Sequence, residues 1–155
     1  MIGLLIIAHE PLATALLHCT RHIHGRLLPQ VAALDVVPDE DPVLAFESAR
    51  NLADRINDGS GILVLTDITG ATPSRIAVQL AEPMRVVVLA GANLPLLLRA
   101  MNYRRGRDLE ALVDQLLPAA RDAIEPVLPD FFAIEEPGDS SKTGPAGHSI
   151  AGPHD

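Results

Sequence analysis

Short runs of mostly apolar residues alternate along the chain with longer stretches in which apolar residues recur every three or four positions. The runs cover residues 2–7, 30–37, 61–66 and 85–90. Short runs of this kind are typical of strands that a parallel sheet buries on both faces. The pattern therefore predicts four strands.

The stretches between and after these runs predict helices, because their apolar residues fall on one side of a helix. Asp41 and Thr72 each precede a proline, and this pair is typical of a cap followed by the first helical residue. Pro118 follows the last apolar stripe, and we expect it to end or kink that helix. The predicted helices cover residues 11–24, 42–56, 73–81, 96–101 and 108–117.

This alternation of strands and helices predicts an α/β fold with a doubly wound, mostly parallel sheet. With four strands the simplest order is 2-1-3-4, the flavodoxin-like arrangement, whose switch point lies between strands 1 and 3. Residues 123–128 predict an additional C-terminal antiparallel strand, which Pro126 would confine to a sheet edge. We expect residues 1–128 to form one domain, and residues 129–155, rich in Gly, Pro, Ser and Asp, to form a largely disordered tail.

Composition narrows the class of function. The net charge of -8 and the 3% of aromatic residues argue against binding to nucleic acid or to an anionic membrane surface. The single cysteine, Cys19, excludes an internal disulfide and fits a reducing compartment. The first apolar run is too short to span a membrane and no basic segment precedes it, so we expect a cytoplasmic protein. Lys142 is the only lysine, which excludes a mechanism that needs a lysine in the core.

The candidate chemistry lies where two of the predicted strands end. His9 follows the first strand and Asp67 follows the third, so the switch point should bring an imidazole beside a carboxylate. Helices are expected to begin after the turns at residues 9–11, 67–73 and 91–95, and helix N-termini favour bound anions. An imidazole beside a carboxylate and an anion site suggests phosphoryl transfer through histidine, with the carboxylate fixing the tautomer.

Three segments, taken in this order and spacing, carry a family resemblance. They are Ile6-Ile7-Ala8-His9, Asp67-Ile68-Thr69-Gly70-Ala71-Thr72-Pro73 and Ala90-Gly91-Ala92-Asn93-Leu94-Pro95. Over about residues 1–128 the chain resembles the mannose-family IIA component of the bacterial phosphoenolpyruvate-dependent sugar phosphotransferase system (PTS). Many members carry glycine after the active histidine, whereas this chain has Glu10, whose carboxylate would repel a phosphoryl group unless it points away.

The resemblance implies that His9 accepts a phosphoryl group from the phosphocarrier protein HPr and passes it to a IIB partner. It implies that Asp67 is the partner of the histidine, and that members are homodimers whose C-terminal strand, here residues 123–128, can cross to the other subunit. We expect no cofactor and no metal, and a membrane association only through a permease complex. The residues expected to bind the phosphoryl group are Thr69, Gly70, Ala71, Thr72 and Asn93.

Other interpretations of the same residues stay open at this point. Asp67 can cap a turn, Thr72 can begin a helix, and Asn93 can close an Asx turn without any ligand. A second hypothesis is a regulatory binding module whose phosphorylation state controls a partner. A response-regulator receiver ranks low because it needs a core lysine, and a nucleotide-binding protein ranks low because no G-x-G-x-x-G segment follows the first strand.

Two clusters of side chains favour a surface role. His18 and His22 are spaced to bind zinc on one helix face, but no third ligand at a matching spacing is evident, so solvated surface histidines are favoured. The four arginines of the basic cluster are also expected on the surface, where they would steer an acidic partner if they have a function. They are Arg99, Arg104, Arg105 and Arg107.

Overall fold

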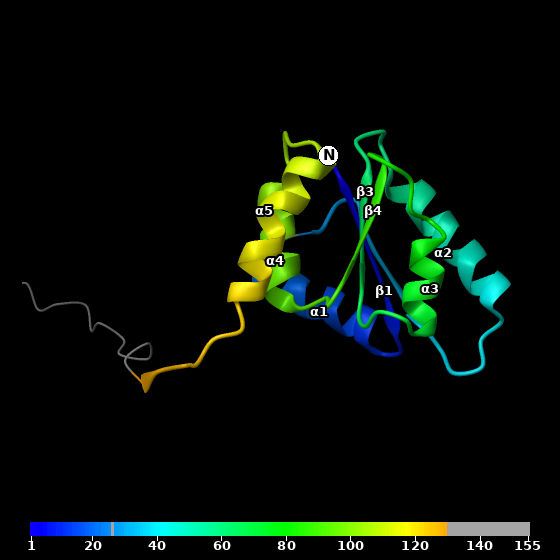
Figure 1. Ribbon diagram of the computed structural model, residues 1–155, viewed down its shortest axis with the longest axis horizontal. Helices are drawn as coiled ribbons and strands as arrows, with labels where there is room; N and C mark the ends of the chain where they lie inside the picture. Colours follow the sequence, from blue (N-terminus) through cyan, green and yellow to red (C-terminus); the bar gives the residue numbers. More distant parts are fainter. Residues whose placement is uncertain (26, 130–155) are drawn as a thin grey trace, which may run out of the picture. The chain divides into compact units, whose positions relative to one another are not determined.

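A four-stranded parallel sheet of order β2-β1-β3-β4 organises the fold, as the sequence predicted (Figure 1). The computed structural model describes residues 1–25 and 27–129. The strands are β1 (Gly3–His9), β2 (Val31–Val36), β3 (Ile62–Thr66) and β4 (Val86–Ala90). Because β1 and β3 are neighbours at the centre, their carboxyl ends meet at one edge of the sheet.

Helices cover both faces of this sheet (Figure 1). One layer contains α1 (Leu12–His24), α4 (Leu94–Tyr103) and α5 (Leu109–Asp122), and the other contains α2 (Pro42–Ile56) and α3 (Thr72–Val78). Asp41 begins α2 as predicted, since its side-chain oxygen accepts a hydrogen bond from the Val43 N–H at 2.9 Å.

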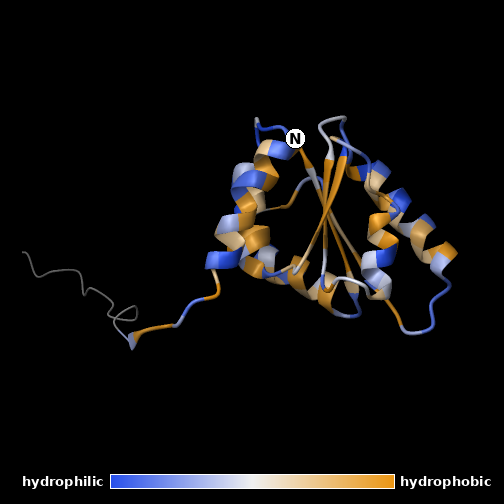
Figure 2. Cartoon of the chain, viewed as in Figure 1, coloured by the Kyte–Doolittle hydropathy of each residue, from blue (hydrophilic) through white to orange (hydrophobic). Residues whose placement is uncertain are grey.

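The core consists of two apolar layers, one on each face of the sheet. Successive side chains of β1 point to opposite faces, so Leu4 and Ile6 pack under α1 and α4, while Leu5 and Ile7 pack under α2 and α3. All four of these side chains are fully buried. Figure 2 shows the same division, with hydrophobic strands at the centre and hydrophilic residues on the outer helix surfaces.

The structure differs from the sequence prediction at several places along the chain. Pro118 does not end its helix: α5 continues to Asp122, because Leu116 before the proline and Ala120 after it both pack against the core. Ala71, not Thr72, is the N-cap residue of α3, and no side chain caps it. Residues 123–128 form no strand within the described chain. The predicted disordered tail, residues 129–155, lies outside the described residues except for Pro129.

Arg104 corrects the prediction of a surface cluster of four arginines. Its side chain is buried, with 1% exposure, whereas Arg99, Arg105 and Arg107 are exposed. The guanidinium is buried because it donates hydrogen bonds to backbone carbonyls near the start of β1 and β2, at 2.7–3.3 Å. Arg104 is therefore part of the core of the fold.

Candidate functional site

His9 and Asp67 form the centre of the site. Ile7 of β1 pairs with Thr66 of β3, so His9, two residues after Ile7, and Asp67, directly after Thr66, lie at the same edge of the sheet. The Nδ1 atom of His9 lies 2.6 Å from Oδ2 of Asp67, and the same oxygen accepts the His9 backbone N–H at 2.9 Å. The structure thus confirms the proximity that the strand order predicted. The His9 ring is half exposed at 53%, while the Asp67 side chain is only 12% exposed.

The charge of Asp67 determines how His9 is protonated. Burial by itself would raise the pKa of Asp67, but hydrogen bonds from the His9 backbone, the His9 ring and the Ile68 N–H outweigh it and lower the pKa. Asp67 is therefore ionised at neutral pH and can only accept hydrogen bonds. Consequently Nδ1 of His9 carries a proton, and in the neutral ring the lone pair lies on Nε2.

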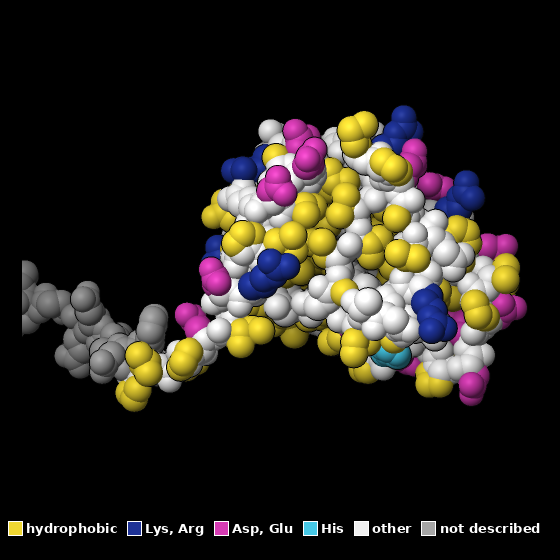
Figure 3. Space-filling model, in the orientation of Figure 1, with side chains coloured by type: hydrophobic (Ala, Val, Ile, Leu, Met, Phe, Trp, Pro, Cys, Tyr) yellow, Lys and Arg dark blue, Asp and Glu magenta, His cyan; other side chains and the backbone are white. Residues whose placement is uncertain are grey.

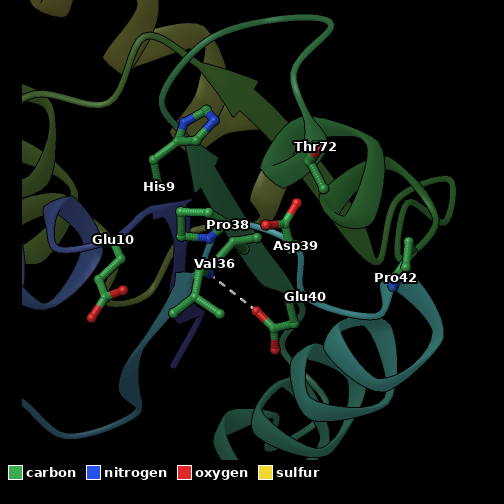
Figure 4. Close-up of a pocket in the computed structure, with 9 residues that line it drawn as sticks. His9, Glu10, Val36, Pro38, Asp39, Glu40, Pro42 and Thr72 are labelled. Atoms are coloured by element: carbon green, nitrogen blue, oxygen red, sulfur yellow. Dashed lines mark hydrogen bonds between the residues drawn. The ribbon is translucent and has the colours of Figure 1, made fainter.

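A cleft of about 440 Å³ lies beside His9, between the end of β2 and the start of α3 (Figure 4). In this view the Glu10 carboxylate points away from the His9 ring. The turn on the far side is fixed by a hydrogen bond of 3.2 Å from the Val37 N–H to Oε2 of Glu40. The residues that line the cleft are His9, Glu10, Val36, Val37, Pro38, Asp39, Glu40, Pro42 and Thr72.

Thr72 is the one predicted phosphate-binding residue that lines this cleft. Thr69 and Gly70 line a separate hollow of about 350 Å³ beside α3 and β4. Ala71 is the N-cap residue of α3. Asn93 caps α4, because its side-chain oxygen accepts the Leu96 N–H at 2.8 Å, and it lines a third hollow with Leu89 and Leu117.

Ser74, in the first turn of α3, is a further residue of the site that the sequence motifs did not indicate. Its hydroxyl accepts a hydrogen bond from the Gly70 N–H at 2.9 Å and donates to the Ala71 carbonyl at 2.8 Å. Gly70 has a φ of +87°, which favours glycine at this turn. The signal that could have revealed Ser74 is its place three residues after Ala71, where a hydroxyl can bond the backbone of the first helical turn.

The three helix starts at this edge differ in their free N–H groups. At the start of α1 the Asp35 side chain accepts the Thr14 N–H, and at the start of α4 the Asn93 side chain accepts the Leu96 N–H. In α3 the backbone N–H groups of Thr72 and Ser74 precede the first intrahelical bond, which Arg75 makes to Ala71 at 3.1 Å. No hydrogen bond to these two groups occurs within residues 1–25 and 27–129. The start of α3 therefore has two backbone N–H groups without a partner among the described residues, next to the loop that follows Asp67.

The chain was compared with known protein families, and the model described as "PTS system fructose IIA component" matches residues 3–117. The chain belongs to this family of PTS IIA components. A curated relative, YadI of Escherichia coli (strain K12), is named as a candidate phosphotransferase enzyme IIA component. YadI is 30% identical over 105 residues, which make up 67% of this chain and 71% of YadI.

Solved structures of PTS proteins share the fold of this IIA component. The phosphotransferase system component EIIA from Streptococcus agalactiae superposes with a TM-score of 0.72 at 25% identity, covering 81% of this chain and 97% of that one. The mannose/sorbose specific IIA subunit from Enterococcus faecalis superposes with a TM-score of 0.70 at 21% identity, covering 82% and 95%. Because the identity to the Enterococcus faecalis subunit is only 21%, this similarity supports the fold alone.

The described part of the IIA component has neither a metal-binding cluster nor a membrane-spanning helix. Residues 1–25 and 27–129 contain no group of three or more His, Cys, Asp or Glu side chains placed to hold a metal ion. His18 and His22 of α1 are exposed. In the same residues no helix has the length and hydrophobicity needed to cross a membrane.

Proposed function

We propose that this IIA component is a phosphohistidine carrier that accepts a phosphoryl group from HPr on His9. The observation that carries the proposal is the distance of 2.6 Å between Nδ1 of His9 and Oδ2 of Asp67. A carboxylate in this position fixes the tautomer of the imidazole and stabilises the positive charge that the ring acquires during transfer. The half-exposed ring is accessible to the phosphoryl group of a partner protein.

The transfer follows from this protonation state. The Nε2 lone pair of His9 attacks phosphorus, a new P–N bond forms, and the P–N bond to the donor histidine of HPr breaks. The electron pair of that bond returns to the donor ring, so no oxidant, reductant or water is consumed. The proton on Nδ1 stays in the hydrogen bond to Asp67, whose negative charge balances the phosphorylated ring.

The phosphoryl oxygens would be held by the loop that follows Asp67 and by the start of α4, at Thr69, Gly70, Ala71, Thr72 and Asn93. The free N–H of Thr72 and its place in the cleft beside His9 support this role most directly. The amide nitrogen of Asn93 has no partner within the described residues, since the helix cap uses only its oxygen. It therefore keeps two N–H groups for an anion.

The downstream step is transfer to a IIB partner, or use of the phosphorylation state to regulate another protein. We propose a cytoplasmic location, in which contact with a membrane occurs only through a permease complex. Glu10 is compatible with transfer because its carboxylate points away from the His9 ring (Figure 4). This orientation weakens the repulsion that its position in the sequence would otherwise imply, because it increases the distance between the two negative charges.

We further propose that the chain forms a homodimer in which residues 123–128 pair with β4 of the other subunit. β4 is an edge strand, and its free side needs a partner or a cover. Figure 3 shows hydrophobic side chains gathered along this side of the sheet, between the two helical layers. A mainly apolar hollow lies next to β4, lined by Leu89, Leu117 and Ile124 among others, and Ile124 is 86% exposed.

Phosphorylation on His9 can be tested with phosphoenolpyruvate, Enzyme I and HPr. The protein should take up label in an acid-labile, base-stable bond, as expected for a phosphohistidine. His9→Ala should abolish the label while the circular dichroism spectrum stays unchanged. His22→Ala, which removes another exposed histidine, should leave labelling intact. Label retained in His9→Ala would refute the assignment.

A further inference from the structure

The helix that follows His9 begins without a cap of its own. Only Glu10 and Pro11 separate His9 from α1. Pro11 stands at the N-cap position and makes no capping hydrogen bond, and the first turn contains no acidic residue. A helix start of this kind leaves N–H groups that need a partner from elsewhere in the fold.

Asp35, in the neighbouring strand β2, supplies that partner. Its Oδ1 accepts a hydrogen bond from the Thr14 N–H at 3.1 Å, and its Oδ2 accepts one from the Thr14 hydroxyl at 2.5 Å. The carboxylate also places negative charge at the positive end of the helix dipole. Asp35, which follows Thr14 by 21 residues, therefore supplies the capping hydrogen bonds that Pro11 at the N-cap position cannot make.

The same cap fixes the main chain around His9. Asp35 pairs with Ala8 in the sheet, and Val36 accepts the Glu10 N–H through its carbonyl at 3.0 Å. The turn from β1 to α1 is thus tied to β2 on both sides of Glu10. His9 needs this precision, because its backbone N–H and its ring must both reach one oxygen atom of Asp67.

We propose that Asp35 is a positioning residue for phosphoryl transfer through His9, because it holds the first turn of α1 where His9 keeps both hydrogen bonds to Asp67. The predicted effect on the rate of phosphoryl transfer rests on the proposed function, whereas the predicted effect on the hydrogen bonding and tautomer of the His9 ring does not. Asp35 touches neither the ring nor the cleft, so it acts only through the α1 turn.

A cap that merely stabilises a helix would give a different result, and Asp108 provides the matched control. Asp108 is the N-cap residue of α5, where its side chain accepts the Ala111 N–H at 2.7 Å, and α5 begins at the opposite end of the sheet from His9 (Figure 1). Asp35→Ala and Asp108→Ala should each lower the melting temperature. Only Asp35→Ala should change the tautomer of the His9 ring and its hydrogen bond to Asp67.

Two measurements on the full chain test the proposal. Nitrogen-15 NMR of the His9 ring should show a protonated Nδ1 in the wild type and in Asp108→Ala, and a loss of this single tautomer in Asp35→Ala. At saturating HPr, the transfer rate constant should fall roughly 10- to 100-fold in Asp35→Ala, with KM for HPr unchanged. Asp35→Asn, whose amide oxygen still accepts the Thr14 N–H, should restore the tautomer and most of the rate.

An Asp35→Ala protein whose His9 signals match those of Asp108→Ala would overturn the proposal. If Asp35→Ala does not fold, Asp35→Val serves instead, since it removes both hydrogen bonds to Thr14 but fills the space of the carboxylate with a side chain suited to a strand. Unchanged His9 signals in that variant would also overturn the proposal. If wild-type His9 takes no label from HPr, the proposed function fails, and the NMR comparison still decides whether Asp35 positions the ring.

Discussion

The guanidinium of Arg104 donates a hydrogen bond of 2.7 Å to the carbonyl of Pro29, 75 residues earlier in the chain. It also donates to the carbonyls of Ile2 at 3.0 Å and Gln30 at 3.3 Å. Burial, and to a lesser extent the charge of Arg105, lower the pKa of Arg104 to about 10, so the group stays protonated at neutral pH. A buried charge thus ties the end of α4 to the start of β1 and β2.

Replacing this guanidinium should destabilise the fold. Arg104→Met keeps the apolar stem but removes the hydrogen bonds to the carbonyls of Ile2, Pro29 and Gln30, of which, among the described residues, only that of Gln30 keeps another donor, the Leu4 N–H. The free energy of unfolding should therefore fall by about 2–5 kcal/mol. Urea denaturation measures this change. Arg105→Met, at the exposed neighbour, should change the free energy of unfolding by no more than about 0.5 kcal/mol. A similarly small change in the free energy of unfolding for Arg104→Met would show that its buried hydrogen bonds contribute little to stability.

Removing the carboxylate of Asp67 should slow transfer without removing the acceptor. In Asp67→Ala the imidazole loses its fixed tautomer and its balancing charge, so the rate of transfer from HPr should fall about 10²- to 10⁴-fold. Prolonged incubation should still label His9. Rapid-quench measurement gives the rate, and Asp54→Ala, which alters an exposed carboxylate on α2, is the control. An unchanged rate in Asp67→Ala would mean that the hydrogen bond has no part in transfer.

Asp67 should also make stability depend on pH in the acid range. Its pKa in the folded protein lies below the ordinary value of 3.8, so the ionised form is favoured by folding. The contribution is fully present above about pH 5, and it is lost as pH falls through the lowered folded pKa. The difference in free energy of unfolding between wild type and Asp67→Asn should therefore shrink as pH falls from 6 to 2. Denaturant titrations at several pH values measure it, and a constant difference would contradict the prediction.

The strands and the pairing of His9 with Asp67 could be predicted because both depend on pattern and topology. A buried run such as residues 2–7 has few alternatives to a central strand, and the strand order then determines which strand ends are neighbours. The family resemblance rests on the same segments. These features do not depend on the detailed shape of any loop.

Features that depend on how distant segments meet could not be predicted in this way. Arg104 lies among other arginines and looks like a surface residue, but the end of α4 meets the carbonyls near Pro29 and buries it. Thr69 and Thr72 are equivalent hydroxyls in the sequence, yet the turn at Gly70 places them at different hollows. Asp35 is an acidic residue in an apolar run, and its role depends on the neighbouring start of α1.

The proposed dimer can be tested by shortening the chain at two points. A chain ending at residue 128 keeps the segment proposed to pair with β4, whereas a chain ending at residue 122 keeps α5 but loses that segment. Light scattering should give a dimer for the full chain and for residues 1–128, and a monomer for residues 1–122. Because α5 and the core are intact in both, the two shortened chains should have similar circular dichroism spectra. Dimers of residues 1–122 would show that association does not use residues 123–128, and a monomeric full chain would refute the dimer itself.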